Sequence, residues 1–369
     1  MKSINFAKGI IITKVKLSYN SQQVIKKLKK NKLAMISLWF IVFCIIISVF
    51  AYQIIPDKTP NANNQLIEIA IRRPGFKVDM LKITPRNSEQ QRMSLKNFFT
   101  GIPDISTYLP IKFYTIEGGT IEYETIDGIE GKMEMHSEES DIEVVTKRYI
   151  FGTDRYGRDV FSRLILGTRV SLSIGTVAVI LSLLIGVFVG SIAGYFRGGI
   201  DKFLMWLINV VWAIPSLLLV IAISFALGRG FWQIFIAIGL TLWVDVARMV
   251  RGQVISIKEQ EYIAAAKTLG YSSTRIIIHH LLPNIISPLL VISASNFATS
   301  ILLEAGLSFL GIGVQPPMPS WGMMIKESYA YLILGYPYLS IIPGIAIMLL
   351  VLAFMLLGNG LRDALDVKN

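Results

Sequence analysis

Six apolar runs dominate the sequence, and each is long enough to cross a lipid bilayer as a helix, which takes about 20 residues. They occupy 33–55, 171–195, 203–227, 231–249, a stretch that begins near 285, and 339–357. Inside the bilayer every backbone N–H and C=O must be paired within the protein, which favours helices. Hydrophobic residues make up 53% of the 369 residues and charged residues only 17%. The sequence therefore predicts an all-α polytopic membrane protein with six transmembrane helices.

Positive charge is concentrated at the N-terminus, where residues 1–32 contain nine Lys and no acidic residue. Basic segments beside transmembrane helices remain in the cytoplasm, so the net charge of +11 indicates topology and lipid contact rather than nucleic-acid binding. This arm is expected either to lie on the anionic membrane surface or to be a disordered tail. The run at 33–55 is too long for a cleaved signal peptide and indicates an uncleaved anchor. Both termini are expected in the cytoplasm.

Residues 56–151 differ in composition from the apolar runs, being rich in Pro, Asn, Glu, Lys and Thr. Two short segments, 114–117 and 120–126, alternate apolar and polar residues as β-strands do. The sequence predicts a small β-containing extracytoplasmic insertion. It is either a contact surface for a substrate-delivery protein or an ordinary enlarged loop.

A charged segment, 152–172, precedes the second apolar run. Gly152 and Gly157 permit tight turns there, and Asp154, Arg158 and Asp159 can pair with one another or cap the helix expected to begin near residue 160. We call these five residues the clasp. They are expected either to hold the structure together at the membrane surface or to contact the substrate.

Glycine and proline mark the next two runs. Gly186, Gly190, Gly194 and Gly198 recur every fourth residue, which places them on one helical face where another helix can approach closely. Pro215 lies midway in the run 203–227 and is expected to kink a single transmembrane helix.

The segment 255–284 is a polar interruption between two apolar runs. Helix-forming residues from Glu261 to Leu269 are followed by Gly270, which suits a left-handed helix cap, and a second helix can start at Ser272 or Ser273. Pro283 is expected to break the chain before the next run. The pattern predicts helix, sharp turn and helix.

Two acidic residues are candidates for a transport pathway or a gate. Asp245 falls near the expected end of the run 231–249. Either it pairs with Arg248 at the cytoplasmic boundary, or Arg248 pairs with nearby acids of the loop. Glu304 follows a Ser- and Thr-rich stretch, 293–300, that suits a helix interface or a hydrated wall. Glu304 is expected to line the pathway or to belong to a buried ion pair.

The 255–284 loop resembles the signature loop of binding-protein-dependent ABC importer permeases: Glu-Ala-Ala, three residues, Gly, nine residues, then Ile-x-Leu-Pro. Two places differ, because Ala264 stands where the family has Glu and His280 where it often has Ile, although His resembles the peptide-importer branch. The resemblance assigns ATPase coupling to Glu261, Ala264, Ala265, Ala266, Gly270, His280, Leu282 and Pro283.

Three further stretches resemble the dipeptide and oligopeptide branch of this family. They are the clasp segment from Gly152, the run 301–322 around Glu304, and the closing 358–366, where Asn359 replaces an Asp. The resemblance implies the type I ABC importer permease fold, with an arm at 1–32, a core at 152–358 and a cytoplasmic tail at 359–369. It also implies a location in the cytoplasmic (inner) membrane.

The same resemblance implies the partners. They are a second permease subunit in a heterodimer, two cytoplasmic ATP-binding subunits and an extracytoplasmic solute-binding protein. The sequence has no G-x-x-x-x-G-K-[ST] loop, no H-E-x-x-H and no C-x-x-C, so we expect no catalytic, cofactor or metal site in this chain, and ATP and Mg to be used by the partner subunits. A non-peptide solute such as nickel, an ion-coupled secondary transporter and a membrane scaffold remain alternatives.

Overall fold

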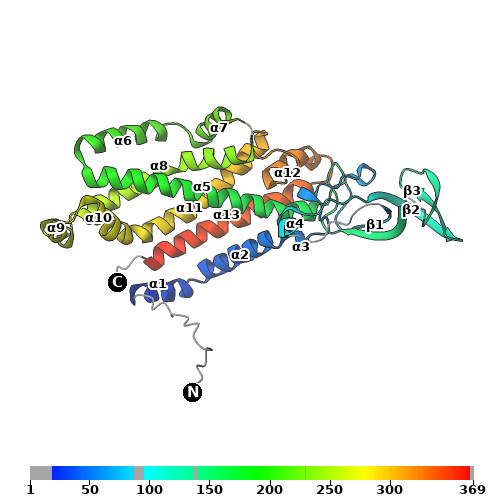
Figure 1. The fold of residues 1–369 in the computed structure, drawn as a ribbon, viewed down its shortest axis with the longest axis horizontal. Coiled ribbons are helices and arrows are strands. Elements are labelled where there is room, and N and C mark those ends of the chain that lie inside the picture. Colours follow the sequence, from blue (N-terminus) through cyan, green and yellow to red (C-terminus); the bar gives the residue numbers. More distant parts are fainter. Residues whose placement is uncertain (1–18, 87–94, 137–139, 229, 366–369) are drawn as a thin grey trace, which may run out of the picture.

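The computed structural model describes residues 19–86, 95–136, 140–228 and 230–365, so part of the N-terminal arm and residues 366–369 of the tail lie outside the described residues. The molecule is elongated, with a helical bundle at one end and a β-sheet at the other (Figure 1). Five helical segments in the described residues are long and apolar enough to cross a membrane, or six if a bent pair counts as one span. They are Lys32–Val49, Val160–Phe196, Trp232–Lys258, Ser273–Leu310 and Tyr338–Leu365. The predicted fold class is confirmed.

The described helices are α1 (Tyr19–Lys30), α2 (Lys32–Val49), α3 (Ala51–Ile54), α4 (Leu95–Thr100), α5 (Val160–Phe196), α6 (Gly198–Trp212), α7 (Ser216–Leu227), α8 (Phe231–Lys258), α9 (Glu261–Thr268), α10 (Ser273–Ile276), α11 (Ile286–Leu310), α12 (Trp321–Ser328) and α13 (Tyr338–Leu365). Short 3₁₀ turns lie at Pro60–Ala62, Ile67–Ile69 and Tyr329–Leu332. Several helices exceed the predicted runs. α5 joins the helix expected to begin near residue 160 to the apolar run 171–195, and α13 continues through the expected start of the tail.

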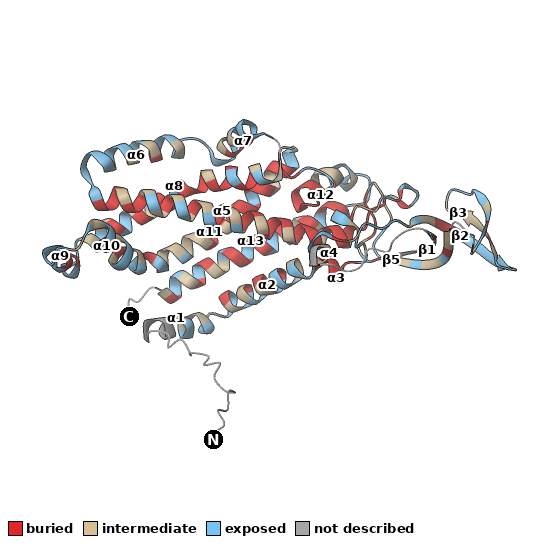
Figure 2. Ribbon diagram, in the orientation of Figure 1, coloured by how far each residue is buried: buried red, intermediate tan, exposed pale blue. Residues whose placement is uncertain are grey.

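The glycine stripe joins the central pair of helices, α5 and α8. A Cβ on Gly186 would lie 2.5 Å from Val246 Cβ, and one on Gly190 would lie 2.5 Å from the Ala247 carbonyl oxygen. A Cβ on Gly194 would lie 2.9 Å from the Arg251 carbonyl oxygen, one turn further along α8, whereas a Cβ on Gly198 would have no atom within 4 Å. Close helix approach is therefore confirmed for three of the four glycines, and Figure 2 shows the buried faces of both helices.

The bend expected at Pro215 is much sharper than a kink within one continuous helix. The chain breaks near Pro215 into α6 and α7, whose axes differ by 94°. Proline lacks the N–H that would continue the helix and restricts the residue before it. Asp201 of α6 accepts hydrogen bonds of 2.6 and 2.7 Å from the Arg251 guanidinium, which ties this segment to α8.

Pro283 does not break the chain as predicted. α10 passes through a π turn at Ile277–Leu281 and a 3₁₀ turn at Leu282–Ile285 into α11, so Ser273–Leu310 forms one 38-residue helical segment. These turns change which carbonyls are paired and thereby accommodate a residue without an N–H. The predicted end of the fourth run at Met249 is also wrong, because α8 continues to Lys258.

The insertion contains a five-stranded antiparallel sheet in the order β4-β3-β2-β1-β5. Its strands are β1 (Phe76–Pro85), β2 (Thr107–Glu117), β3 (Thr120–Thr125), β4 (Glu130–Glu134) and β5 (Ser140–Tyr149). The two predicted β segments correspond to β2 and β3 and are confirmed. Buried Met80 and Leu81 belong to two small apolar clusters in this region.

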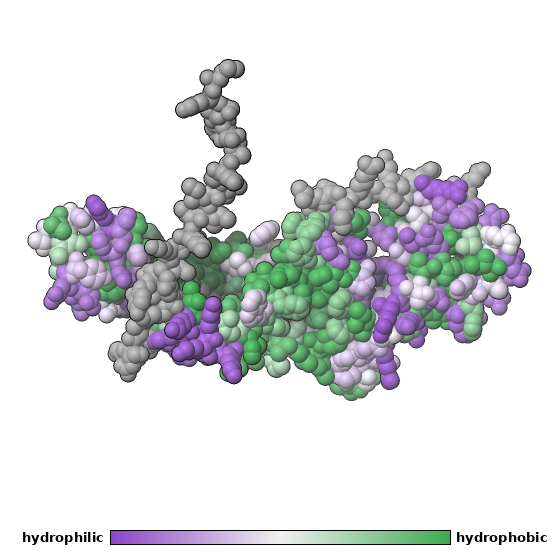
Figure 3. All heavy atoms as spheres, turned by 90° about the horizontal axis from the view of Figure 1, so that it is seen from below, coloured by the Kyte–Doolittle hydropathy of each residue, from purple (hydrophilic) through white to green (hydrophobic). Residues whose placement is uncertain are grey.

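Figure 3 shows an apolar band across the middle of the molecule between two more polar ends. One end carries the sheet, and the other carries α9 and α10 together with α1 and the end of α13 (Figure 1). We call them the sheet end and the loop end. An apolar girdle of this kind is what a bilayer requires of a membrane-spanning bundle.

Candidate functional site

The 255–284 loop forms the predicted helix, turn and helix at the loop end. α9 ends in a left-handed turn at Gly270, whose φ is +77°. The Gly270 N–H donates to Lys267 O at 2.9 Å and the Tyr271 N–H donates to Ala266 O at 3.1 Å. These two bonds define a Schellman cap, which glycine adopts without the strain that a Cβ would add. The predicted cap is confirmed.

The second helix of the loop starts at Ser273, after an N-cap at Ser272 whose hydroxyl accepts from the Arg275 N–H at 3.4 Å. The His280 ring stacks on Tyr271 with centroids 5.9 Å apart. Asn284 Nδ2 donates to the His280 carbonyl at 2.6 Å. His280 therefore holds the turn against the second helix.

The exposed residues of the loop define the surface it offers to a partner. Ala266 and Ile263 are buried against the bundle, whereas Ala264 and Ala265 are exposed and Leu269 exposes 72% of its area. Glu261 and Pro283 are also exposed, and Leu282 is half-buried. The small side chains of Ala264 and Ala265 beside Leu269 make a compact, low-relief apolar patch, and the exposed charges of Glu261 and Lys267 lie on the same short helix.

The clasp lies where α5 begins, at the sheet end. Asp154 accepts from the Arg158 N–H at 3.0 Å and from Arg158 Nε at 2.6 Å. Arg158 Nη2 donates to Glu327 of α12 at 2.6 Å. Arg163 lies within 3.7 Å of Asp154 and 3.9 Å of Glu327. Two buried arginines and two carboxylates therefore form one network between α5 and α12.

Asp159 is the N-cap of α5, as predicted. Its Oδ2 accepts from the Ser162 N–H at 3.0 Å and the Ser162 hydroxyl at 2.5 Å. Burial raises the pKa of Asp159, and the hydrogen bonds from Ser162 oppose that rise. The carboxylate thus satisfies a helix N-terminus at a site where water is excluded.

The two clasp glycines hold the insertion against the bundle. Gly157 has a φ of +73°, and a Cβ there would lie 1.7 Å from Leu66 O. Gly152 packs equally closely against the backbone of Arg72, because a Cβ on Gly152 would lie 2.1 Å from Arg72 O. No side chain fits at these positions unless the 66–72 segment moves.

Sequence reasoning missed Glu327 and Arg163 as members of this network. Glu327 follows Arg158 by 169 residues, and no local pattern links an isolated acid to a distant arginine. A weak signal existed for Arg163, because a cation within the first turn of a membrane-length helix needs a counter-charge.

The two candidate pathway acids have contrasting environments. Glu304 of α11 is fully buried, and the Ser308 hydroxyl donates to its Oε1 at 2.7 Å. Asp245 of α8 is exposed. The expected pairing of Asp245 with Arg248 is wrong, since Arg248 donates instead to Asn209 Oδ1 at 2.6 Å. A pathway or gate role for either acid stays a prediction.

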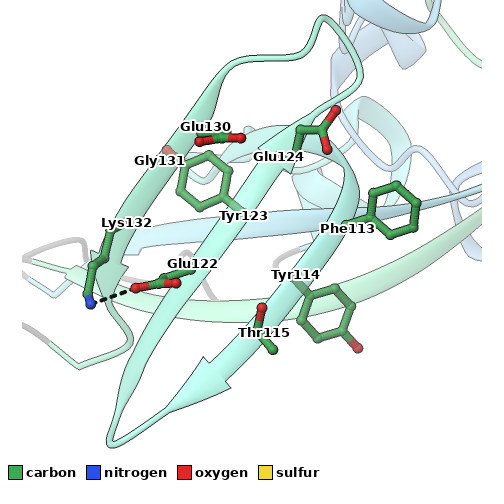
Figure 4. Close-up of a pocket in the computed structure, with 9 residues that line it drawn as sticks. All are labelled: Phe113, Tyr114, Thr115, Glu122, Tyr123, Glu124, Glu130, Gly131 and Lys132. Atoms are coloured by element: carbon green, nitrogen blue, oxygen red, sulfur yellow. Dashed lines mark hydrogen bonds and ion pairs between the residues drawn. The ribbon is translucent and has the colours of Figure 1, made fainter.

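A hollow of about 530 Å³ lies at the tip of the sheet, between β2, β3 and β4 (Figure 4). Aromatic side chains Phe113, Tyr114 and Tyr123 line it beside acids that include Glu122, which pairs with Lys132 at 2.7 Å. Whether the insertion contacts a delivery protein stays a prediction.

Two family profiles match the chain. Residues 186–368 match the binding-protein-dependent transport system inner membrane component, and residues 20–67 match the N-terminal TM domain of oligopeptide transport permease C. Together they cover α1, α2 and most of the helical bundle, including the 255–284 loop.

Curated relatives match from three-fifths to nearly all of the chain. The dipeptide transport system permease protein DppC of Alkalihalophilus pseudofirmus is 45% identical over 59% of this chain and 71% of its own length. The oligopeptide transport system permease protein OppC of Bacillus subtilis is 43% identical over 60% of this chain and 73% of its own.

The dipeptide transport system permease protein DppC of Lactococcus lactis subsp. cremoris is 33% identical over 97% of this chain and 93% of its own length. That alignment is long enough to include the insertion. The chain therefore belongs to the family of inner membrane components of binding-protein-dependent transport systems.

Proposed function

We propose that this chain is the permease subunit of an ATP-driven importer that carries dipeptides or oligopeptides across the cytoplasmic membrane. The observation that carries the proposal is the likeness to the Lactococcus lactis dipeptide permease, which extends over 97% of this chain. The two shorter matches are to a dipeptide and an oligopeptide permease.

In this proposal the 255–284 loop docks on a cytoplasmic ATPase. The exposed surface around Ala264, Ala265 and Leu269 is the contact, and the Gly270 cap keeps the two loop helices at a fixed angle. Because Ser273–Leu310 is one helical segment, a displacement of the loop moves α11 along with it. ATP and Mg act on the partner subunits, and their closure drives this chain between inward- and outward-facing states.

The proposed partners are a second permease subunit, two ATPases and an extracytoplasmic solute-binding protein. α6 and α7 support the first of these, because they leave large apolar side chains exposed: Phe203, Trp206, Trp212, Leu218 and Phe225. Surfaces of this kind are covered by lipid or by another subunit. Both termini are proposed to be cytoplasmic, since α1 carries Lys27, Lys29 and Lys30 in its last turn at the loop end.

The test combines purification with uptake. Extraction in mild detergent should recover this chain with two nucleotide-binding proteins and a second permease, and the purified complex should accumulate labelled peptide in proteoliposomes only with ATP. Uptake driven by an ion gradient without ATP would contradict the proposal, and so would ATP-dependent uptake of nickel but not of peptide.

Gly270→Glu tests the coupling step. A bulky acidic residue at φ +77° strains the turn and alters the contact, so uptake should be lost while membrane insertion is retained. Gly252→Ala is the matched control, because its Cβ would meet open space within α8. Normal uptake by the Gly270→Glu complex would refute the coupling role.

A further inference from the structure

Asp245 places a carboxylate near the middle of a membrane-length helix. It lies 14 residues after the first residue of α8, Phe231, and 13 before the last, Lys258. At 1.5 Å per residue it is about 20 Å from either end. A charge at that depth is costly against lipid, and such residues face a bundle interior, a partner or a water-filled space.

The packing of α8 defines the direction in which Asp245 points. Its neighbours Val244 and Val246 are buried, while Asp245 is exposed. Val246 and Ala247 contact the glycine stripe of α5, and the helical period places Asp245 on the opposite side of α8. The carboxylate therefore points away from α5.

Apolar contacts on either side of Asp245 show which part of α11 lies at the same level. Leu242 shares a cluster with Leu303 and Leu307. Val246 shares the next cluster with Leu289 and Ile292. Asn296 of α11 donates to the Ser182 hydroxyl of α5 at 3.5 Å, and Ser182 lies one turn before Gly186, where a Cβ would meet Val246. Asp245 thus lies within about one helical turn of the level of Asn296.

That segment of α11 presents hydroxyl groups. Ser295 is exposed and Thr299 is half-buried, and the Thr299 hydroxyl donates to Ser295 O at 3.1 Å. Each hydroxyl oxygen keeps acceptor capacity for water. A carboxylate and two hydroxyls within about two helical turns of one another along the bundle are suited to a hydrated surface.

The carboxylate is available to a ligand. In the described part of the chain no ion pair involves Asp245. Arg248, less than one turn away, is held by Asn209 and by Trp212, whose ring centroid lies 4.0 Å from the guanidinium carbon.

We propose that Asp245, Ser295 and Thr299 line a hydrated, cation-attracting section of the transport passage, and that Asp245 favours solutes with a positive charge. For a peptide that charge is the α-ammonium group or a basic side chain. The choice of solute rests on the proposed function, whereas the negative potential of the passage follows from the placement of Asp245.

Thiol modification tests the potential without any transported solute. In the intact transporter with Cys44→Ala, Ser295→Cys should react faster with a cationic than with an anionic methanethiosulfonate. Asp245→Asn should lower that rate ratio by about fivefold, because loss of one unit charge within about 8 Å in water slows the cationic reagent and speeds the anionic reagent by about twofold each. Asp245→Glu should preserve the ratio, and so should Asp363→Asn, which alters an exposed acid near the end of α13. An unchanged ratio in Asp245→Asn, or no modification by either reagent, would overturn the proposal.

Uptake by proteoliposomes tests the solute preference. Asp245→Asn should reduce the ratio of lysine-containing to glutamate-containing tripeptide uptake, and Asp245→Glu should restore it. Equal loss of both peptides would assign Asp245 to structure or to an ion pair with the second permease and overturn the preference. If the unaltered complex with its solute-binding protein carries no dipeptide or oligopeptide, the proposed function fails, while the thiol rates still decide whether the passage is negative.

Discussion

Replacing Glu327 by alanine should strongly destabilise the sheet end of the bundle. Glu327 exposes 9% of its side chain, and the arginines it faces, Arg158 and Arg163, expose 2% and 1%. Glu327 also lies 3.9 Å from the more exposed Arg155, so the substitution leaves Asp154 as the remaining acid in contact with Arg158 and Arg163. Removing one partner of a buried pair costs about 3–5 kcal/mol, because a desolvated charge is left uncompensated.

Glu327→Gln separates charge from shape. The amide oxygen can still accept from Arg158, so part of the hydrogen bonding survives, and the loss should be smaller than for alanine. Glu122→Ala is the control, because its pair with Lys132 has both side chains about three-fifths exposed (60% and 61%). A surface pair of this kind contributes less than about 1 kcal/mol.

The free energy of unfolding is measured by titrating sodium dodecyl sulfate into mixed micelles of the purified complex. Trp321 lies in the same short helix as Glu327 and donates to Leu164 O at 2.9 Å. The chain has six tryptophans, so the fluorescence change that is lost in a Trp321→Phe background reports separation of α12 from α5. If Glu327→Ala proves as stable as Glu122→Ala, the network does not hold the bundle together and the reasoning fails.

Two further predictions use the same unfolding measurement. Gly190→Leu should lower the free energy of unfolding by about 1–3 kcal/mol through overpacking, because an added Cβ would lie 2.5 Å from Ala247 O. Gly252→Ala should cause no measurable change, since its Cβ would meet open space. Equal stability of the two variants would contradict close helix packing. Asp159→Ala should lower the free energy of unfolding by about 1 kcal/mol through loss of the helix cap, and Asp159→Asn should lower it clearly less because an amide oxygen can still accept. An equal loss in both variants would show that the charge of Asp159, rather than its hydrogen bond, is what matters.

Local patterns predicted the elements whose causes are local. The Gly270 cap, the Asp159 N-cap and the glycine stripe depend on residues a few positions apart, and the structure has all three. The expectation for Pro283 was wrong and the bend at Pro215 was underestimated, because the effect of a proline depends on what surrounds it. At Pro283 the π and 3₁₀ turns absorb the missing N–H, while at Pro215 the chain turns through 94°.

Long-range partners could not be predicted. Arg158 had a visible local acid, Asp154, but its second partner lies in α12. Arg248 had an acid three residues away and instead contacts Asn209 and Trp212 of α6. Tertiary packing decides these pairings, and an isolated charge in the sequence does not reveal which segment will lie beside it.

The account depends most on the 255–284 loop being in the cytoplasm and meeting an ATPase there. The direct measurement is labelling of Ala265→Cys in a Cys44→Ala chain with a membrane-impermeant thiol reagent. Ala265 is exposed, and Cys44, the single native cysteine, is buried. The account predicts no labelling in intact cells, labelling in inside-out vesicles, and protection when the ATPase subunits are bound. Labelling from outside intact cells would contradict it.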